Sequence, residues 1–191
     1  MEKKKKFDIS KFATGRVAVF IDAANILYSQ QTMKWDLDYK KLSKYLRKHL
    51  NIVFVGFYHG SLRDSKGQRE FFQILEDNEY TLRTKPVKYI KVDGGEILKG
   101  NLDIEIAFDI LTTLDTFDTC ILMSGDSDFE IILRYLKKKG KKVVVVSTKG
   151  HVSYEIIRAS HKYIDLKRLK LELSREKNKQ KNTPEHKSTR G

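Results

Sequence analysis

Short apolar runs alternate with helical patterns along most of this chain, and this alternation restricts the fold more than any other feature of the sequence. The first run, Val17–Ile21, is apolar throughout and predicts a strand buried on both faces. The other predicted strands are Ile52–Tyr58, Thr81–Lys85, Thr119–Met123 and Val143–Ser147, with shorter candidates at Tyr89–Val92 and Tyr163–Leu166. The predicted helices are Ala23–Gln31, Tyr39–Lys48, Gln68–Asn78, Leu102–Thr113, Phe129–Lys139 and Ser153–Ser160. Strands that alternate with helices imply a parallel α/β sheet with helices on both faces.

The helix predicted at Leu102–Thr113 has the clearest apolar periodicity. Its apolar residues at i, i+3, i+4 and i+7 are Ile104, Ala107, Phe108 and Leu111. This spacing predicts that these four side chains face the core. Asn101, just before the helix, is a suitable N-cap.

Composition divides the 191 residues into one domain, residues 16–169, and two basic ends. Residues 1–15 form a basic N-terminal extension, and residues 170–191 are polar and charged enough to predict a disordered tail. The formal net charge of +13 is spread through the chain and is not confined to these ends. Such an excess favours a polyanionic partner, because cations neutralise phosphates and release counterions. The same charge can also serve solubility alone.

Nothing in the sequence predicts a membrane partner. The longest apolar runs, such as Val143–Val146, are too short to span a bilayer. No signal-peptide pattern follows the charged N-terminus, so we expect a cytoplasmic protein. The single Cys120 lies within an apolar run, and we expect it to be a small core residue.

Carboxylates follow two of the predicted strands, and a helix adds another. Asp22 ends the first strand, and Asn25 follows it by one helical turn. Asp126 and Asp128 come directly after a later strand, and Asp103 lies in the first turn of the middle helix. In a parallel α/β sheet the ligand crevice lies beyond the carboxyl ends of the strands, at the switch in strand order. If the strands of Asp22 and Asp126 are neighbours, three segments bring carboxylates to one rim.

Several carboxylates at one place repel each other, and a divalent cation removes this repulsion. Mg²⁺ or Mn²⁺ suits an all-oxygen set, whereas no His–Cys spacing of the zinc type is present. Taken one at a time, Asp22, Asp126 and Asp128 are explained equally well as helix caps or turn residues. Asp109 lies about 240° round the helix from Asp103, so we expect Asp109 to have a structural or supporting role.

Three ordered motifs resemble those of the NYN domains, PIN-like nucleases, in their LabA/DUF88 branch. The motifs are Phe20-Ile21-Asp22-Ala23-Ala24-Asn25, Lys99-Gly100-Asn101-Leu102-Asp103 and Ser124-Gly125-Asp126-Ser127-Asp128-Phe129. The resemblance covers residues 16–166. It implies a PIN-like, three-layer α/β/α sandwich with a parallel five- or six-stranded sheet, and Mg²⁺- or Mn²⁺-dependent cleavage of RNA. One departure is Glu130-Ile131, where many relatives have a small residue and proline.

The resemblance also implies roles for individual residues. The candidate metal ligands and catalytic residues are Asp22, Asp103, Asp126 and Asp128. Asn25 is implied as a positioning group in the same site. Both a one-metal and a two-metal mechanism are compatible with this set.

Basic and aromatic residues near the expected rim are candidates for nucleic-acid binding. Lys99 stands just before the middle helix, and Arg63, Lys66 and Arg69 follow the second strand. Each can contact a phosphate or simply be a solvated charge. Tyr58 ends the second strand and can stack on a base, although tyrosines at such places are commonly core residues with a wet hydroxyl.

The sequence therefore predicts a metal-dependent endoribonuclease. The alternative is a catalytically weak or inactive NYN-type module that binds RNA and regulates. A phosphohydrolase of the haloacid-dehalogenase type is disfavoured, because Asp22-Ala23-Ala24 lacks the Asp-x-Asp that such an enzyme needs. RNA is the expected partner, with DNA as a second option, and the sequence leaves open whether the chain forms a homodimer.

Overall fold

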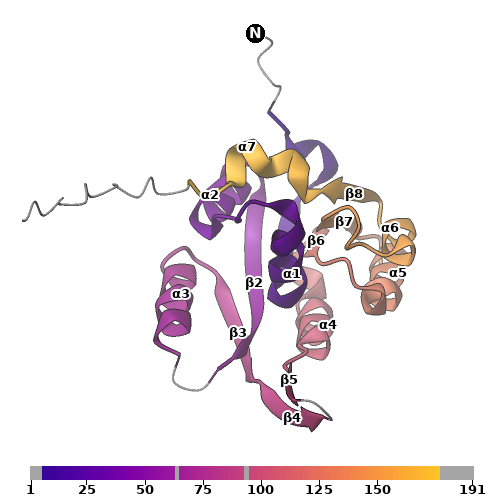
Figure 1. The fold of residues 1–191 in the computed structure, drawn as a ribbon. Coiled ribbons are helices and arrows are strands. Elements are labelled where there is room, and N and C mark those ends of the chain that lie inside the picture. The colour runs from indigo at the N-terminus through magenta and orange to yellow at the C-terminus, as the bar shows by residue number, and fades with distance from the viewer. Residues whose placement is uncertain (1–5, 63–64, 93–94, 177–191) are drawn as a thin grey trace, which may run out of the picture.

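The computed structural model describes residues 6–62, 65–92 and 95–176, and its centre is one parallel sheet (Figure 1). The six strands lie in the order β3-β2-β1-β6-β7-β8, and each neighbouring pair is parallel. Their bounds are β1 (Arg16–Asp22), β2 (Asn51–Ser61), β3 (Thr81–Pro86), β6 (Thr119–Met123), β7 (Lys142–Ser147) and β8 (Lys162–Asp165). The parallel α/β sheet expected from the sequence is confirmed.

β1 and β6 are neighbours at the middle of the sheet. Both are apolar and almost wholly buried, because helices cover the sheet on both faces. Their register pairs Ile21 with Met123, so the residues that follow the two strands arrive at the same edge. β1 pairs with β2 on its other side. The switch in strand order therefore lies between β1 and β6, where a parallel sheet opens a ligand crevice.

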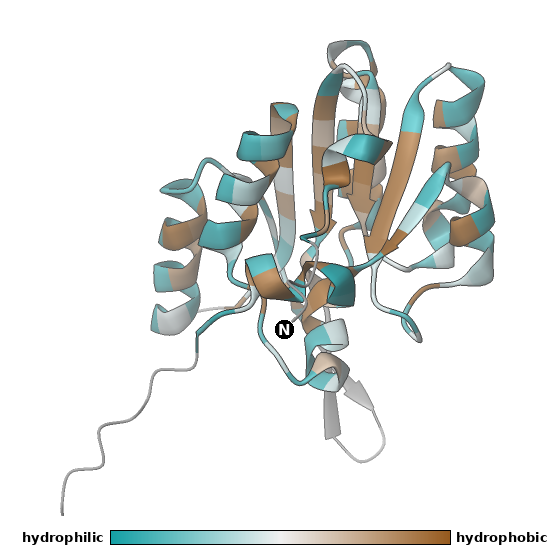
Figure 2. Ribbon diagram, turned by 90° about the horizontal axis from the view of Figure 1, so that it is seen from above, coloured by the Kyte–Doolittle hydropathy of each residue, from teal (hydrophilic) through white to brown (hydrophobic). Residues whose placement is uncertain are grey.

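Helices form a layer on each face of the sheet, which confirms the three-layer α/β/α sandwich. One face carries α1 (Ala23–Met33), α2 (Tyr39–His49), α3 (Lys66–Glu76) and α7 (Lys170–Leu173). The other face carries α4 (Asp103–Thr112), α5 (Glu130–Lys138) and α6 (Tyr154–Ala159). Figure 2 shows apolar residues concentrated in the central strands, between the two helical layers. Burial of one large apolar side chain, such as Phe20, stabilises the fold by roughly 1.5–3 kcal/mol.

A short antiparallel hairpin extends from the main sheet beyond β3 (Figure 1). It pairs β4 (Lys88–Val92) with β5 (Gly95–Lys99). The short candidate strand Tyr89–Val92 corresponds to β4, whereas no strand was predicted at β5. Residues 93 and 94, between the two strands, lie outside the described residues.

Packed structure reaches beyond residues 16–169 at both ends. Before β1, the 3-10 helix η1 (Ile9–Phe12) buries Ile9 against the core. After residue 169, α7 buries Leu173, and Ser174 forms a β-bridge with Leu37. The prediction of a disordered tail from residue 170 is therefore wrong for residues 170–176. The rest of that tail, like residues 1–5, lies outside the described residues.

Helix α4 turns a different side to the core from the one predicted. Ile106 and Ile110 are buried, together with Leu102 just before the helix. These three residues form a second apolar stripe with a spacing of four, and this stripe packs against the sheet. The predicted core residues that are instead exposed are Ile104, Phe108 and Leu111.

Cys120 is fully buried in β6, as expected of a core residue. Burial raises the pKa of its thiol, which keeps the sulfur protonated and unreactive. Within the described part of the chain, no helix has the length and apolar character that crossing a membrane requires.

Candidate active site

Asp22 ends β1, and its carboxylate is held from two sides. Oδ1 accepts a hydrogen bond from the backbone N–H of Asn25 at 3.2 Å, which caps the first turn of α1. Oδ2 accepts a hydrogen bond from the hydroxyl of Ser124 at 2.8 Å. The residue is 9% exposed. This burial raises the pKa of Asp22, and the charge of Asp126 raises it further. Asp22 is thus both a cap and a member of an acidic site.

The turn after β6 is tied to α1 by buried polar groups. The Oγ of Ser124 accepts a hydrogen bond from the backbone N–H of Asp126 at 3.2 Å. The N–H of Gly125 donates to Oδ1 of Asn25 at 3.1 Å. A side chain at position 125 would collide with the backbone of His151, so the close approach of that loop requires glycine. Asn25 therefore positions the turn that carries the next carboxylates.

Three carboxylates converge at this edge of the sheet. Oxygens of Asp103, Asp126 and Asp128 all lie within 4.8 Å of one another. Oδ1 of Asp126 accepts the backbone N–H of Asp128 at 3.0 Å, which makes Asp126 the cap of the 3-10 turn leading into α5. Asp128 itself is exposed. Of these two aspartates, Asp126 is therefore the one whose side chain caps the turn before α5.

Asp103 opens α4 and is oriented by Asn101. The side-chain amide of Asn101 donates to Oδ2 of Asp103 at 2.6 Å, and its Oδ1 accepts the backbone N–H of Asp103 at 2.7 Å. Partial burial raises the pKa of Asp103, and the charges of the other three aspartates raise it further. Asp103 is therefore close enough to sense the charges of carboxylates that come from two other segments.

The residues present are compatible with a hard divalent cation. The three converging groups offer only carboxylate oxygens, which suit Mg²⁺ or Mn²⁺ better than zinc. Their mutual repulsion is a second reason to expect a cation. A cavity of about 410 Å³ gives access to the site. Among the residues that line it are Asp22, Asn25, Tyr28, Tyr58, Asp103 and Asp126.

Comparison with known proteins identifies the family. The family model of the NYN domain matches residues 16–169. The chain belongs to the NYN family. It is 36% identical over 159 residues to the Low amplitude and bright protein LabA of Synechococcus elongatus, which covers 81% of this chain and 86% of LabA. The crystal structure of a protein of unknown function from Vibrio parahaemolyticus has a TM-score of 0.69 at 22% identity, covers 87% of this chain and 96% of its own, and supports the fold.

Tyr58 is a core residue of this NYN domain. It is 1% exposed, and its hydroxyl donates to Oδ2 of Asp109 at 2.8 Å. The same oxygen accepts a hydrogen bond from Nε of Arg83 at 2.9 Å. Of the two alternatives given for Tyr58, the structure supports the core residue: burial leaves its ring unavailable for stacking on a base. The carboxylate of Asp109 thus accepts hydrogen bonds from both Tyr58 and Arg83, which confirms the structural or supporting role expected of Asp109.

Two of the predicted phosphate contacts, Lys66 and Arg69, do not line the cavity of the carboxylates. Lys66 and Arg69 are exposed in the first turn of α3, where Lys66 pairs with Glu70 at 3.8 Å. Neither is among the residues that line the carboxylate cavity. Arg63 and the side chain of Lys99 lie outside the described residues. A role of these four residues in nucleic-acid binding stays a prediction.

Sequence reasoning missed two residues of the site and understated a third. Ser124 bonds both Asp22 and Asp126, and its position directly after a buried strand was the available signal. Tyr28 lines the cavity three residues after Asn25, a spacing that places both on one side of a helix. Asn101 was expected only as a cap, yet it also holds the carboxylate that follows it.

Proposed function

We propose that this NYN domain is a metal-dependent endoribonuclease. The observation that carries the proposal is the convergence of three carboxylates within 4.8 Å at the switch point of the sheet. Like charges that lie close together destabilise each other, and helix capping does not require them to be close. Capping alone therefore does not explain this cluster. Membership of the NYN family and the similarity to LabA support the proposal.

The side chains divide into ligands and supports. Asp103, Asp126 and Asp128 would hold one or two ions, and Asp22, which lines the same cavity as Asp103 and Asp126, remains a candidate ligand. A bound Mg²⁺ or Mn²⁺ supplies an activated water and stabilises charge on the phosphate. Ser124 keeps the turn after β6 in place, and Asn101 orients the carboxylate of α4. These hydrogen bonds within the protein fix the orientation of the carboxylates, which favours a preorganised site.

Cleavage of a circular RNA tests the proposal, because a circle without ends can be opened only by an endonuclease. We expect linear product with Mn²⁺ and none with EDTA. Asp126→Asn should abolish cleavage, since the amide keeps the backbone cap but offers the cation no charge. Asp115→Asn is the matched control, because Asp115 is exposed and lies outside the cluster. A circular DNA of the same sequence distinguishes the two nucleic acids.

Retained cleavage by the Asp126→Asn protein would reject the assignment of the site. Salt-sensitive RNA binding by the wild type without any Mn²⁺-dependent cleavage would select the alternative, an inactive RNA-binding regulatory module.

A further inference from the structure

Tyr28 places an aromatic ring at the edge of the carboxylate cavity. It lies on α1 and lines the same cavity as Asp22 and Asp103. The residue is 61% exposed, in contrast to the buried Tyr58. Tyrosine rings bury a large apolar area when a partner is available, and an exposed ring beside a polar site is a typical contact for a flat ligand.

The ring of Tyr28 is braced on one side. The ring of His151 meets it at right angles, with the planes at 86° and the centroids 5.0 Å apart. Nε2 of His151 lies 2.8 Å from Oγ1 of Thr32, a hydrogen bond that fixes the histidine. Tyr28 therefore has a supported position before any ligand binds, while most of its surface remains free.

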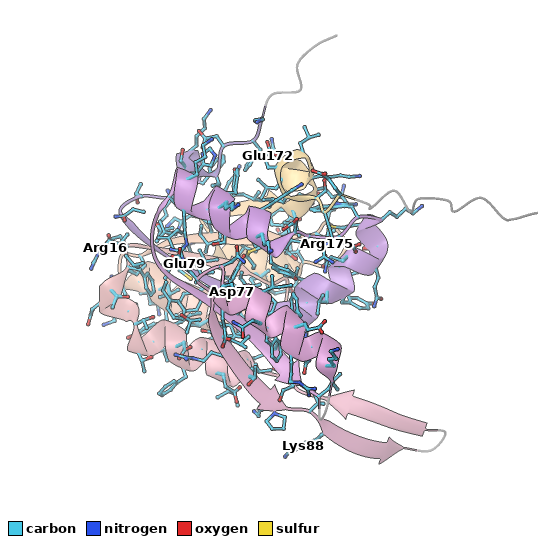
Figure 3. The ribbon with its side chains drawn as sticks, turned by 90° about the vertical axis from the view of Figure 1, so that its left-hand side faces the viewer. Arg16, Asp77, Glu79, Lys88, Glu172 and Arg175 are labelled. Atoms are coloured by element: carbon cyan, nitrogen blue, oxygen red, sulfur yellow. The ribbon has the colours of Figure 1, made fainter. Side chains whose placement is uncertain are left out.

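A second apolar surface also borders the carboxylates. A groove of about 700 Å³ between α4 and α5 reaches Asp103 and Asp128. Ile104 and Ile131 line it, and each is 79% exposed. Lys88 lines it as well, and Figure 3 shows this lysine at the base of the β4–β5 hairpin. Apolar walls with a nearby cation match the apolar faces of a base and the negative charge of its phosphate.

We propose that Tyr28 is a substrate-positioning residue, whose ring stacks on an unpaired base of the RNA beside the phosphate at the carboxylates. This inference rests on the proposed nuclease function. In a duplex the bases are stacked on each other and show only their edges in the grooves, so no base face reaches Tyr28. In a single strand the bases can turn out and stack on aromatic rings. Because every base has such a face, we expect little sequence preference.

Equilibrium binding of a fluorescent single-stranded RNA tests this proposal without requiring cleavage. Anisotropy is measured in EDTA at low ionic strength for the wild type, Tyr28→Ala and Tyr28→Phe. The alanine variant should bind about 5- to 150-fold more weakly, the range for loss of one base–aromatic stack. The phenylalanine variant keeps the ring and should bind like the wild type. Because Tyr28 is exposed, thermal unfolding of both variants should match that of the wild type.

The same RNA annealed to its complement provides the second comparison, and the wild type should bind this duplex more weakly than the single strand. Equal affinities of the two Tyr28 variants would overturn the proposal, as would equal wild-type affinities for single strand and duplex. If only Tyr28→Ala binds weakly, the stacking role is supported. If, in addition, neither the wild type nor the variants cleave RNA, only the nuclease function is rejected. If the protein cleaves RNA with Mn²⁺ but both variants bind RNA equally well, the nuclease function is supported and the stacking role of Tyr28 is rejected.

Discussion

Asp126→Asn should stabilise the protein in the absence of metal. The change removes one charge from three carboxylates within 4.8 Å and keeps an oxygen that accepts the N–H of Asp128. At 4.8 Å two unit charges repel by roughly 1 kcal/mol in bulk water and roughly 3.5 kcal/mol at an effective dielectric constant of 20. Because Asp128 is exposed and Asp103 half-buried, the lower value applies. Because the change removes two such repulsions, those with Asp103 and Asp128, we expect a gain of about 1–2 kcal/mol, which raises the Tm by about 2–8 °C.

With a divalent metal present, the wild type should become more stable than the Asp126→Asn protein. An ion that binds only the folded protein stabilises the wild type by about 2.7 kcal/mol at a concentration of 100 Kd. The Asp126→Asn protein has lost one ligand charge and should gain much less. Thermal unfolding in EDTA and over a series of Mn²⁺ concentrations measures both effects.

Asp115→Asn is the control for this experiment, because it removes the same charge outside the cluster and should keep the wild-type response to Mn²⁺. If Asp126→Asn is less stable than the wild type in EDTA, or gains as much from Mn²⁺, the argument from shared negative charge is refuted.

Four further substitutions test other parts of the structure by urea unfolding. Ser124→Ala should cost about 1–3 kcal/mol, because a buried carboxylate loses its donor, and an unchanged stability would contradict the observed bond. Ile106→Ala should cost about 2–5 kcal/mol and Ile104→Ala less than about 0.5 kcal/mol, since only Ile106 is buried; the reverse order would restore the face predicted from periodicity. Burial, and after it two nearby lysines, lower the pKa of His161 below 6.5; between this lowered pKa and 6.5 the unfolded chain binds more protons, so stability should rise as the pH increases and fall as the pH is lowered through this window. His161→Asn should flatten this fall, and an unchanged pH dependence would exclude His161 as its source.

The position of the acidic site could be predicted because parallel sheets impose it. Asp22 and Asp126 follow apolar runs, and the carboxyl ends of parallel strands share one edge. The missing fact was the adjacency of β1 and β6, which are separated by a long stretch of chain and pair only in the folded sheet. No local pattern encodes that pairing.

The buried side of α4 and the role of each tyrosine could not be predicted, for related reasons. α4 is apolar on more than one side, so Ile104 and Ile106 both fit a helical stripe, and tertiary packing chose the second. Tyr58 lies on β2 and Tyr28 on α1, and both line the cavity of the site. Only the packing of the fold buries the first beside Asp109 and leaves the second exposed in the cavity. Sequence spacing predicts on which side of a helix or strand a residue lies, but it does not predict which other elements cover that side.

The central claim is that distant carboxylates share a divalent cation, and an anomalous-difference map from crystals soaked in Mn²⁺ tests it most directly. We expect a peak within coordination distance of Asp103, Asp126 and Asp128, and its loss in crystals of the Asp126→Asn protein. A map from wild-type crystals at saturating Mn²⁺ with no peak at these oxygens would contradict the account.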